Sequence, residues 1–561
     1  MKKVIAFIVS ILSFSANAQN PITIPDTLTG TTINLTMHTD SVGFLSGIKT
    51  FTNAFNLYSY LGPTLILNKG DSVTMNVTNN LGDTTTVHWH GLHVPAMDDG
   101  GPHTVILNGN TWSPEFKVMN NASTFWYHPH THMKTGQQAM RGAAGLIIVR
   151  DSIESTLGLP RKYGVDDFPL IVQSQQFDSN NQIVWRGMHD STLLVNGTIN
   201  PMLDVPTQVV RLRLLNASQE RNFNFGFSGN KSFYVIGNDG GLLNAPVTVN
   251  RIRLSPGERA EILIDLSGLS GQVIYLMSYA SEFAMGVQGG VPMPGMDTAM
   301  YSPINGIDFN ILQLNVGSTT ANPITFIPSS LVSVTPWIES QSTITRQITI
   351  TAQNMMSMDG PFYFNGNLFD MNRIDYQIPL NNIEIWSITN QTMVAHPFHI
   401  HDVQFFVLDR DGISAAPEEK GYKDVVMIAP NETIRFITRF EDFTDTMPYM
   451  YHCHILMHED DGMMGQFKVV PNVNGIKEIK ENSMFTLYPN PISDILNIKF
   501  SSITDGTINV YDAIGCLRVS QQNFEQQDNL ILNTSEWKSG VYFITLKNRM
   551  SCGTQKIIKT N

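Results

Sequence analysis

Apolar and polar residues alternate with a period of two at three widely separated places, and this pattern constrains the fold more than any other feature. The runs are Ser72 to Thr78 (SVTMNVT), Val209 to Leu215 (VVRLRLL) and Ile383 to Ile388 (IEIWSI). Such alternation between turn residues is typical of half-buried antiparallel strands. Each run ends near an asparagine, at Asn79, Asn216 and Asn390. Three similar blocks indicate three related β-sandwich domains.

The alternation also predicts which side chains face the core. In the second run, Val210, Leu212 and Leu214 fall on the face that we expect to be buried. Arg211 and Arg213 fall on the opposite face, and we expect them to point outward. A low charged fraction of 15%, with 42 Gly and 28 Pro, supports an all-β architecture rich in loops.

The length of the chain requires several domains, because 561 residues are too many for one hydrophobic core. The predicted fold class is therefore all-β, with three sandwich domains at about residues 20–152, 160–325 and 330–472. A polar connector, Pro471 to Asn482, separates them from a smaller β-sandwich module at about 483–561.

The N-terminal segment 1–18 has the pattern of a secretory signal peptide. Lys2 and Lys3 precede an apolar run from Val4 to Phe14, and Ala16-Asn17-Ala18 precedes the expected cleavage site. A membrane anchor is the alternative, but the run is shorter than the ~18 residues that a transmembrane helix needs. No later segment is long and apolar enough to span either. We therefore expect export across the inner membrane, passage through the periplasm, and no transmembrane segment in the mature protein.

The charge of the chain limits its partners. The formal net charge is −13, and it becomes −15 when cleavage removes Lys2 and Lys3. An acidic surface of this kind disfavours nucleic acid and anionic membranes as partners.

The C-terminal module has features of its own. It begins with FTLYPNP (Phe485 to Pro491), contains GVYFITL (Gly540 to Leu546) and ends in a segment with lysines. A small accessory sandwich is one interpretation. The motifs also resemble the C-terminal sorting domain of the type IX secretion system. That resemblance implies the secretion and sorting machinery as a partner, and a secreted or cell-surface location.

The cysteines point to a metal. Three cysteines cannot form a disulfide framework. Cys516 and Cys552 either pair with each other or are free, and Cys453 then has no partner thiol. An exported thiol is exposed to oxidation unless something occupies it, and Cys453 lies between two histidines.

Ten of the 15 histidines fall into four tight clusters. The clusters are His88-Trp-His90, His128-Pro-His130, His396-Pro-Phe-His399-Ile-His401, and His452-Cys453-His454 followed by His458. On a strand, residues i and i+2 point to the same face, so each His-x-His pair projects two ligands together. The middle block has one histidine, His189, and is interpreted as a spacer or a wall. We therefore expect the metals to lie between the first and third domains.

The donor types favour copper. Imidazole suits several metals, but thiolate and thioether ligands beside it narrow the choice toward copper. Cys453, His396, His458 and Met463 together supply the ligand set of a blue-copper site. Because His452 and His454 face away from Cys453, a metal on the thiolate would be linked to theirs by very few bonds. Eight histidines remain, enough for three further ions. Scattered structural histidines, or a zinc site, are the alternative interpretation.

The histidine motifs resemble those of the multicopper oxidases, especially the bacterial three-domain branch with laccase-like and cuprous oxidases. They are HWHG (His88 to Gly91), WYHPHTH (Trp126 to His132), HPFHIH (His396 to His401) and HCHILMHEDDGMMG (His452 to Gly465). The resemblance covers about residues 25–470. It implies three cupredoxin-like Greek-key domains that hold four copper ions, one of type 1, one of type 2 and two of type 3.

Carried over position by position, the resemblance implies a ligand set for each ion. The type 2 copper would bind His88 and His399. One type 3 copper would bind His90, His128 and His454, and the other His130, His401 and His452. The type 1 copper would take His396, Cys453, His458 and the axial Met463, and electrons would enter it at an accessible edge of His458.

Two acids are candidates for supplying protons to dioxygen. The resemblance assigns this catalytic role to Asp99, in the turn after HWHG, and to Glu459, which follows His458. The neighbouring acids Asp98, Asp460 and Asp461 are interpreted as solvated charges. The remaining histidines near the clusters are not expected to be ligands. They are His93, His103 and His132.

The resemblance implies a secreted, laccase-like oxidase that couples one-electron oxidation of phenol-like reductants to four-electron reduction of dioxygen to water. One alternative is a cuprous oxidase in copper detoxification, but its acidic and Met positions before His396 are Thr392 and Val394 here. Two methionine clusters favour Cu(I) instead; they are Met285, Met293, Met296 and Met300, and Met355, Met356 and Met358. The motifs also leave open a non-enzymatic copper-binding protein, a relative that has lost its metals, and a copper nitrite reductase.

Overall fold

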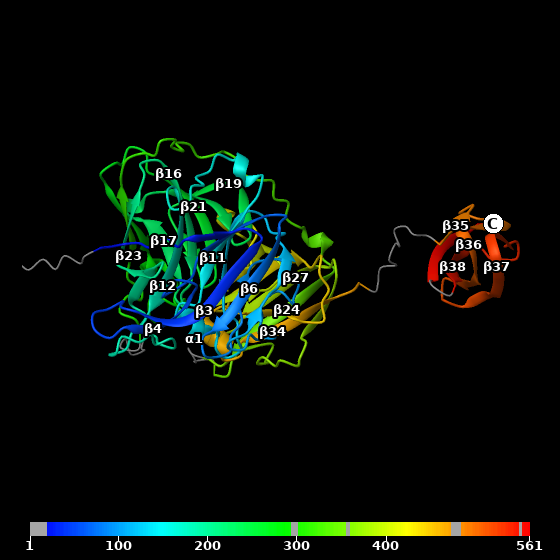
Figure 1. Cartoon of the computed structure of the whole chain (residues 1–561), viewed down its shortest axis with the longest axis horizontal. Helices are drawn as coiled ribbons and strands as arrows, with labels where there is room; N and C mark the ends of the chain where they lie inside the picture. The colour runs from blue at the N-terminus through cyan, green and yellow to red at the C-terminus, as the bar shows by residue number, and fades with distance from the viewer. Residues whose placement is uncertain (1–18, 293–300, 355–359, 473–483, 549–551, 561) are drawn as a thin grey trace, which may run out of the picture. The chain divides into compact units, whose positions relative to one another are not determined.

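The computed structural model describes residues 19–292, 301–354, 360–472, 484–548 and 552–560 (Figure 1). The predicted signal peptide and most of both methionine clusters lie outside these residues. The chain divides into two compact units, one ending at Asn472 and one beginning at Val473. Among the described residues the fold is β throughout, apart from short 3₁₀ turns and the helices α1 (Thr135–Met140) and α2 (Leu456–Asp460). No helix in this part of the chain is long and apolar enough to cross a membrane.

Two five-stranded sheets form the first layer pair of the larger unit. One has the order β2 (Thr27–Thr29), β5 (Thr64–Asn68), β11 (Gly145–Arg150), β10 (Ser123–His128), β7 (His88–His90). The other has the order β4 (Thr50–Phe55), β3 (Thr32–Val42), β6 (Ser72–Asn80), β8 (Thr111–Trp112), with β9 (Glu115–Lys117) also on β6. The predicted run from Ser72 is confirmed, because Val73, Met75 and Val77 are buried in the core between these sheets.

The second layer pair contains the largest sheet. Its order is β14 (Thr198–Ile199), β13 (Thr192–Val195), β12 (Asp167–Gln175), β16 (Val209–Asn216), β21 (Arg259–Asp265), β18 (Phe233–Asn238), β19 (Gly241–Val249). The facing sheet has the order β1 (Asn20–Pro21), β15 (Pro201–Val205), β23 (Phe309–Val316), β22 (Val273–Ser278), β17 (Phe223–Phe227), β20 (Ile252–Leu254). The N-terminal strand β1 therefore pairs with this second layer pair, in parallel with β15.

The third layer pair carries most of the motif residues. One sheet has the order β26 (Tyr376–Pro379), β34 (Met464–Val470), β33 (Tyr449–Cys453), β28 (His396–Ile400), β31 (Val425–Ile428). The other has the order β25 (Phe362–Phe364), β24 (Ile344–Ala352), β27 (Ile383–Asn390), β32 (Thr433–Arg439), β29 (Phe405–Arg410), β30 (Ile413–Ser414). Trp386 and Ile388 of β27 lie in the core between them, while Ile385 packs on a second cluster with Phe406.

The C-terminal unit is a single hydrogen-bonded sheet around its own apolar core. Its strands are β35 (Phe485–Tyr488), β36 (Ile495–Asp512), β37 (Leu517–Asn533), β38 (Gly540–Lys547) and β39 (Cys552–Lys559). The long strand β36 pairs with β35, β37 and β38. Cys516 is an exposed free thiol.

The three asparagines after the alternating runs play the same structural part in all three layer pairs. The side-chain oxygens of Asn79, Asn216 and Asn390 each accept from the backbone N–H two residues later, at 3.0, 3.0 and 2.9 Å. Each amide also donates to backbone carbonyls farther along the chain. An Asx turn ends the strand and ties the following loop to the sheet. In the third layer pair this turn holds the loop that leads into His396.

The prediction that Arg211 and Arg213 point to solvent is wrong. Both guanidinium groups are buried, and both form ion pairs with Glu261. Arg213 also donates to Thr124 of β10 at 2.9 Å, so the first layer pair covers this face of the second. Alternation detects the face that meets the core, but it cannot tell a solvated face from one that another domain covers with paired charges.

Candidate metal centre

Strand register brings the His-x-His pairs together. Within the first layer pair, β10 places His128 directly opposite His88 of β7. Within the third, β28 places His399 opposite His452 of β33. The rings of His88 and His401 stack at 3.9 Å between centroids, and those of His90 and His399 at 3.8 Å. The histidines of the four motifs therefore lie at the junction of the first and third layer pairs, as predicted.

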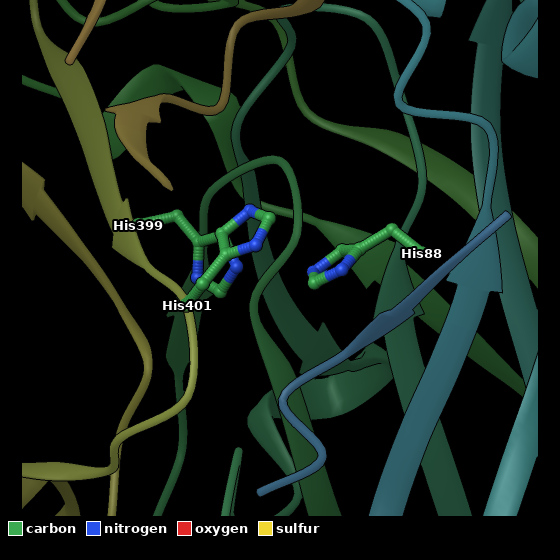
Figure 2. Close-up of side chains that lie close together, drawn as sticks. All are labelled: His88, His399 and His401. Atoms are coloured by element: carbon green, nitrogen blue, oxygen red, sulfur yellow. The ribbon is translucent and has the colours of Figure 1, made fainter. Parts of the chain in front are cut away.

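Ligand atoms converge in four groups of histidine and cysteine. All the groups are buried, and the donor atoms in each lie within 4.8 Å of one another; they are His88/His399/His401, His90/His128/His454, His130/His401/His452 and His396/Cys453/His458. Figure 2 shows the first group, with His88 facing His399 and His401 from an opposing segment. Every predicted histidine and cysteine ligand is a member of at least one group. None of His93, His103 and His132 belongs to a group among the described residues.

Backbone carbonyls fix the tautomers of four of these imidazoles. The Nδ1 atoms of His88, His128, His399 and His452 lie 2.8–3.1 Å from the carbonyls of Asp99, Pro129, Asp424 and Cys453. A carbonyl can only accept, so each Nδ1 carries the proton and each Nε2 offers a lone pair. The Nε2 atoms of His88 and His399 are buried and have no hydrogen-bond partner.

His90 has the opposite tautomer and gives the sharpest test of a metal. Its Nε2 lies 3.1 Å from a carboxylate oxygen of Asp424 and donates to it, so Nδ1 holds the lone pair. That Nδ1 lies 3.4 Å from the Nε2 of His128, which is also a lone pair. Two buried lone pairs that face each other repel unless a cation lies near both. The donor set therefore fits a metal ion.

The histidines are also in the protonation state that ligation needs. Burial, followed by the charges of the neighbouring imidazoles, lowers the pKa of His90, His128, His130, His399 and His452 well below 6.5. The rings are therefore neutral at physiological pH, and they can bind a metal without first losing a proton.

The fourth group contains the predicted sulfur ligand. The Sγ atom of Cys453 lies 3.6 Å from Nδ1 of His396 and 3.5 Å from Nδ1 of His458. Met463 is fully buried, and its backbone bonds to both Cys453 and His458. Burial raises the pKa of the Cys453 thiol, so a thiolate here needs a bound cation. His452 and His454 contribute to the other groups, which confirms that Cys453 faces the opposite way.

The surroundings of Cys453 do not include the accessible edge of His458 that we expected. The edge of His458 is not accessible, because this residue is only 3% exposed. The ring of Phe362 covers His458 and His396 at centroid distances of 4.5 and 4.6 Å. On the other side of His396, Nε2 lies 3.0 Å from the hydroxyl of Thr392. The ring of Phe362 excludes water from its side of a metal bound here.

Asp99 lies against two of the imidazoles. Its Oδ2 atom is 2.6 Å from Nδ1 of His401, and its Oδ1 atom is 3.3 Å from Nδ1 of His88. Burial opposes ionisation, but interaction with His88 and His401 outweighs burial and lowers the pKa of the Asp99 carboxyl. Asp99 is therefore a carboxylate that orients His401 through Nδ1 and leaves Nε2 for a metal.

Glu459 is placed on another side of the same cluster. Its carboxyl oxygens lie 3.3 Å from Nδ1 of His130 and 3.5 Å from Nδ1 of His452. Thr135 donates to it at 2.7 Å. Burial, together with the charge of Asp460, raises the pKa of Glu459 well above its ordinary value. Burial thus favours the protonated form of Glu459, whereas the contacts of Asp99 favour its carboxylate form.

The prediction that Asp460 is a solvated charge is wrong. Its two oxygens accept from the backbone N–H groups of Thr135 and Gly136 at 2.9 and 3.0 Å, at the start of α1. Burial raises the pKa of its carboxyl to about 7. Asp461 does reach the surface, where Arg186 binds it with two hydrogen bonds.

Sequence reasoning missed Asp424 and Arg259. Besides its contacts to His90 and His399, Asp424 accepts two 2.6 Å hydrogen bonds from the guanidinium of Arg259, on β21 of the second layer pair. Arg259 also donates to the carbonyl of Gly257, whose missing side chain leaves room for the ring of His454. The middle layer pair is therefore more than a spacer. The only sequence signal was a charged Lys-Asp pair before an apolar strand.

Comparison with known families agrees with this geometry. Models described as multicopper oxidase match residues 44–154, 163–292 and 339–473. A model described as secretion system C-terminal sorting domain matches residues 486–560.

Two curated relatives illustrate the range of the similarity. The chain is 37% identical over 418 residues to a multicopper oxidase of Staphylococcus haemolyticus, which covers 73% of this chain and 82% of the relative. It is 34% identical over 417 residues to the cell division protein FtsP of Xenorhabdus nematophila, covering 73% of this chain and 84% of the relative.

Solved structures match the larger unit. A laccase-like multicopper oxidase, CueO, from the lignin-degrading bacterium Ochrobactrum sp. superimposes with a TM-score of 0.71 at 33% identity, covering 80% of this chain and 100% of that one. A multicopper oxidase from Campylobacter jejuni, described as a metallo-oxidase, gives 0.68 at 26%, covering 81% and 96%. With its buried histidine clusters and a C-terminal sorting domain, the chain belongs to the multicopper oxidase family, the copper-dependent oxidoreductases that use dioxygen.

Proposed function

We propose that this protein is a secreted, laccase-like oxidase that takes single electrons from phenol-like reductants and uses four of them to reduce dioxygen to two waters. Four phenols lose four electrons and four protons, giving four phenoxyl radicals and two waters for each dioxygen. The observation that carries the proposal is the pair of buried lone pairs on His90 and His128, facing each other at 3.4 Å. Neither a metal-free relative nor a set of structural histidines needs that arrangement.

The groups around these lone pairs support four copper ions. His88 and His399 would hold the type 2 ion, and the two remaining triads would hold the type 3 pair; they are His90/His128/His454 and His130/His401/His452. The type 1 ion would take His396, Cys453, His458 and Met463. When bound, copper supplies the one-electron redox chemistry that these side chains lack.

Residues of the chain would link the copper sites, supply a proton and orient the imidazoles. Cys453 is bonded through the backbone to His452 and His454. A short covalent route would therefore join the type 1 ion to the type 2 ion and the type 3 pair, which together would form a trinuclear cluster. Glu459 lies beside His130 and His452, and its protonated form, which burial favours, would supply a proton for the reduction of dioxygen. Ionised Asp99 holds His88 and His401 in the tautomers that expose Nε2.

Phenols are favoured over Cu(I) by the residues before His396. The hydroxyl of Thr392 bonds to His396 and to the carbonyl of Val394, and Val394 has an apolar side chain. Neither residue offers the soft donor that Cu(I) prefers. The CueO relative from Ochrobactrum has oxidase activity towards lignin model compounds and lignosulfonate. The Campylobacter relative is a metallo-oxidase, which keeps a cuprous oxidase in copper detoxification as the second candidate.

Oxygen consumption separates the candidates. We expect uptake with dimethoxyphenol, and loss of both uptake and blue absorption in Cys453→Ser. Blue absorption without oxygen uptake from any reductant would identify a non-enzymatic copper-binding protein. Replacing Met355, Met356 and Met358 together should barely change phenol oxidation. A selective loss of Cu(I) oxidation in that variant, by about tenfold or ~1.4 kcal/mol in barrier, would favour the metallo-oxidase instead.

The C-terminal unit supports sorting to the outside of the cell after export through the periplasm. If it is a cleaved signal, the exported protein should end near residues 471–482, and deletion of the unit should leave active oxidase in the periplasm. An intact mass that includes Asn561 argues against cleavage, and normal export of the deletion variant argues against sorting.

A further inference from the structure

The first described residues of the chain are held against the second layer pair. Strand β1 pairs in parallel with β15, with Asn20 opposite Pro201. The backbone N–H of Asn20 donates to the Asn200 carbonyl at 2.9 Å, and its side-chain amide donates to the Ile199 carbonyl at 2.7 Å. Among the described residues, Gln19 is thus the only one that precedes this paired strand.

The expected signal cleavage gives Gln19 a chemistry that no internal glutamine has. Ala16-Asn17-Ala18 is a small-residue cleavage site, and a cut after Ala18 leaves Gln19 as the first residue. Its α-amino group is then free and lies within reach of its own side-chain amide. Gln19 is exposed in the structure, so neither group is hindered by the fold.

A glutamine with a free α-amine can close on itself as a five-membered ring. The α-nitrogen attacks the Cδ carbonyl carbon, a new C–N bond forms, and the bond from Cδ to the side-chain nitrogen breaks. That nitrogen leaves as ammonia and takes one proton from the α-amine, and no electron is transferred. The product is pyroglutamate, a lactam with one N–H, no charge and no free amine. The reaction needs no second reactant.

A cavity beside Gln19 has the size and the chemistry for such a ring. Its volume is about 310 Å³, and Gln19 is itself one of the lining residues. Leu45, from a loop of the first layer pair, and Tyr275, from β22 of the second, supply apolar surface. Ser191 and Asn310 supply polar groups. None of the described lining residues carries a charge.

The uncharged lining favours the lactam over an unmodified N-terminus. An α-amino group has a pKa of about 8, so it is mostly an ammonium ion near neutral pH. With no carboxylate among the described lining residues, that ammonium has no partner in the cavity and must remain in water. The lactam has no charge to desolvate, so it can lie against Leu45 and Tyr275.

We propose that Gln19 becomes the N-terminus on export, is converted to pyroglutamate, and lies with its ring in this cavity. Strand β1 has only two residues and is the edge strand of its sheet, so trimming of the N-terminus by an aminopeptidase would remove it. A lactam offers no free amine to such an enzyme. The modification therefore protects the strand that begins the exported protein, and it is independent of the proposed function.

Mass spectrometry of the exported full-length protein tests the modification directly. The N-terminal tryptic peptide, Gln19 to Lys49, should be lighter than its sequence requires by the mass of one ammonia molecule. Edman degradation should be blocked, and pyroglutamyl peptidase should release the block so that reading starts at Asn20. A free amine on Gln19, or an N-terminus at any other residue, would overturn the inference.

Gln19→Asn is the matched variant for the protective effect. It keeps the amide but is shorter by one methylene, and the four-membered ring that it would need does not form. Sequencing should find a free amine at position 19 in this variant. An added aminopeptidase should then remove that residue, whereas the wild type should keep its N-terminus. Equal trimming of the two proteins would reject the protection.

Hydrogen exchange tests whether the ring lies in the cavity. The N–H groups of Asn20 and Ile22 donate to carbonyls of the second layer pair, and a ring packed beside β1 should keep them closed for longer. We expect their exchange to be about tenfold slower in the wild type than in Gln19→Asn. The N–H of Gly317, which donates to Val205 at the far end of β15, is the internal control. Equal rates at Asn20 and Ile22 would overturn the placement of the ring.

Discussion

Hydrogen bonds from single residues fix the tautomers of the imidazoles in the candidate metal centre. Four backbone carbonyls and the carboxylate of Asp424 each accept one ring N–H, and every such bond aims the other nitrogen into the cluster. The pKa values of Asp99 and Glu459 shift in opposite directions because their surroundings differ. Interaction with two imidazoles lowers the pKa of Asp99, whereas burial and the carboxyl of Asp460 raise the pKa of Glu459.

Substituting Asp99 should slow oxygen reduction while copper stays bound. Asp99→Asn keeps the shape but removes the charge that orients His401, and we expect a loss of about 10–100-fold. The return of blue absorption after a reduced sample meets dioxygen measures this step. Asp98→Asn is the control, because Asp98 precedes the turn residue without bonding to a ligand. A normal rate in Asp99→Asn would remove its role.

Glu459 should control the alkaline limb of the pH profile. Its pKa is raised, so it keeps its proton to a higher pH than an ordinary glutamate and loses it as pH rises through that raised value. We expect oxygen reduction to decline there in the wild type. Glu459→Gln should be slower at neutral pH and should lack that decline. An unchanged profile in the variant would assign the limb to another group.

At the scale of elements, a tight turn places the carboxylate of Asp99. Gly100 follows Asp99 with a φ of +79°, and a Cβ would lie 1.8 Å from the carbonyl oxygen of Val87, next to His88. The turn thus returns Asp99 to the strand that carries the first histidine pair. Here a glycine is needed for space as well as for conformation.

Gly100→Ala should therefore destabilise the protein more than backbone strain alone. Gly109 has a similar φ of +83° but nothing within 4 Å of a Cβ, so Gly109→Ala is the matched control. We expect about 1–2 kcal/mol for the control, and a clearly larger loss with reduced trinuclear copper for Gly100→Ala. Unfolding free energies and copper content measure this. Equal losses would contradict the steric argument.

At the scale of the molecule, the middle layer pair supports the histidine cluster, although none of its described residues belongs to a metal-binding group. Arg259 is fully buried and pairs with Asp424, which contacts His90 and His399. Lys423, Asp239 and Glu258 extend the buried ion pairs around it. Domain packing is thereby coupled to ligand orientation.

Arg259→Met should leave the Asp424 carboxylate unpaired, at a cost of about 3–5 kcal/mol. We expect weaker copper binding in the trinuclear cluster, seen in the electron paramagnetic resonance of non-blue copper, with blue absorption retained. Arg211→Met is the control, since Arg211 is equally buried and paired with Glu261 but bonds to no ligand residue. If both variants altered the spectrum alike, the effect would be one of general stability.

The junction of the first and third layer pairs should weaken at alkaline pH. Burial lowers the pKa of His93, but Asp402 and Asp442 outweigh it and raise that pKa to about 9. The stabilisation is fully present below about 6.5 and is lost as pH rises through about 9. His93→Gln should therefore show a smaller fall in unfolding free energy between these values. His103→Asn, which crosses the same junction to Gln466, should behave like the wild type.

The sequence by itself determined the β architecture and the histidines and cysteine that converge in the structure. Those features follow from local periods: alternation marks a strand, and a His-x-His pair on a strand projects to one side. The position of Cys453 between His452 and His454 likewise predicted that its thiol and the two imidazoles face opposite sides of the strand. The tertiary structure decided the features that short-range sequence patterns do not encode. The burial of Arg211, Arg213 and Asp460 and the contact of Arg259 with Asp424 all arise where separate domains meet, because only packing determines whether a polar face meets water or another chain segment.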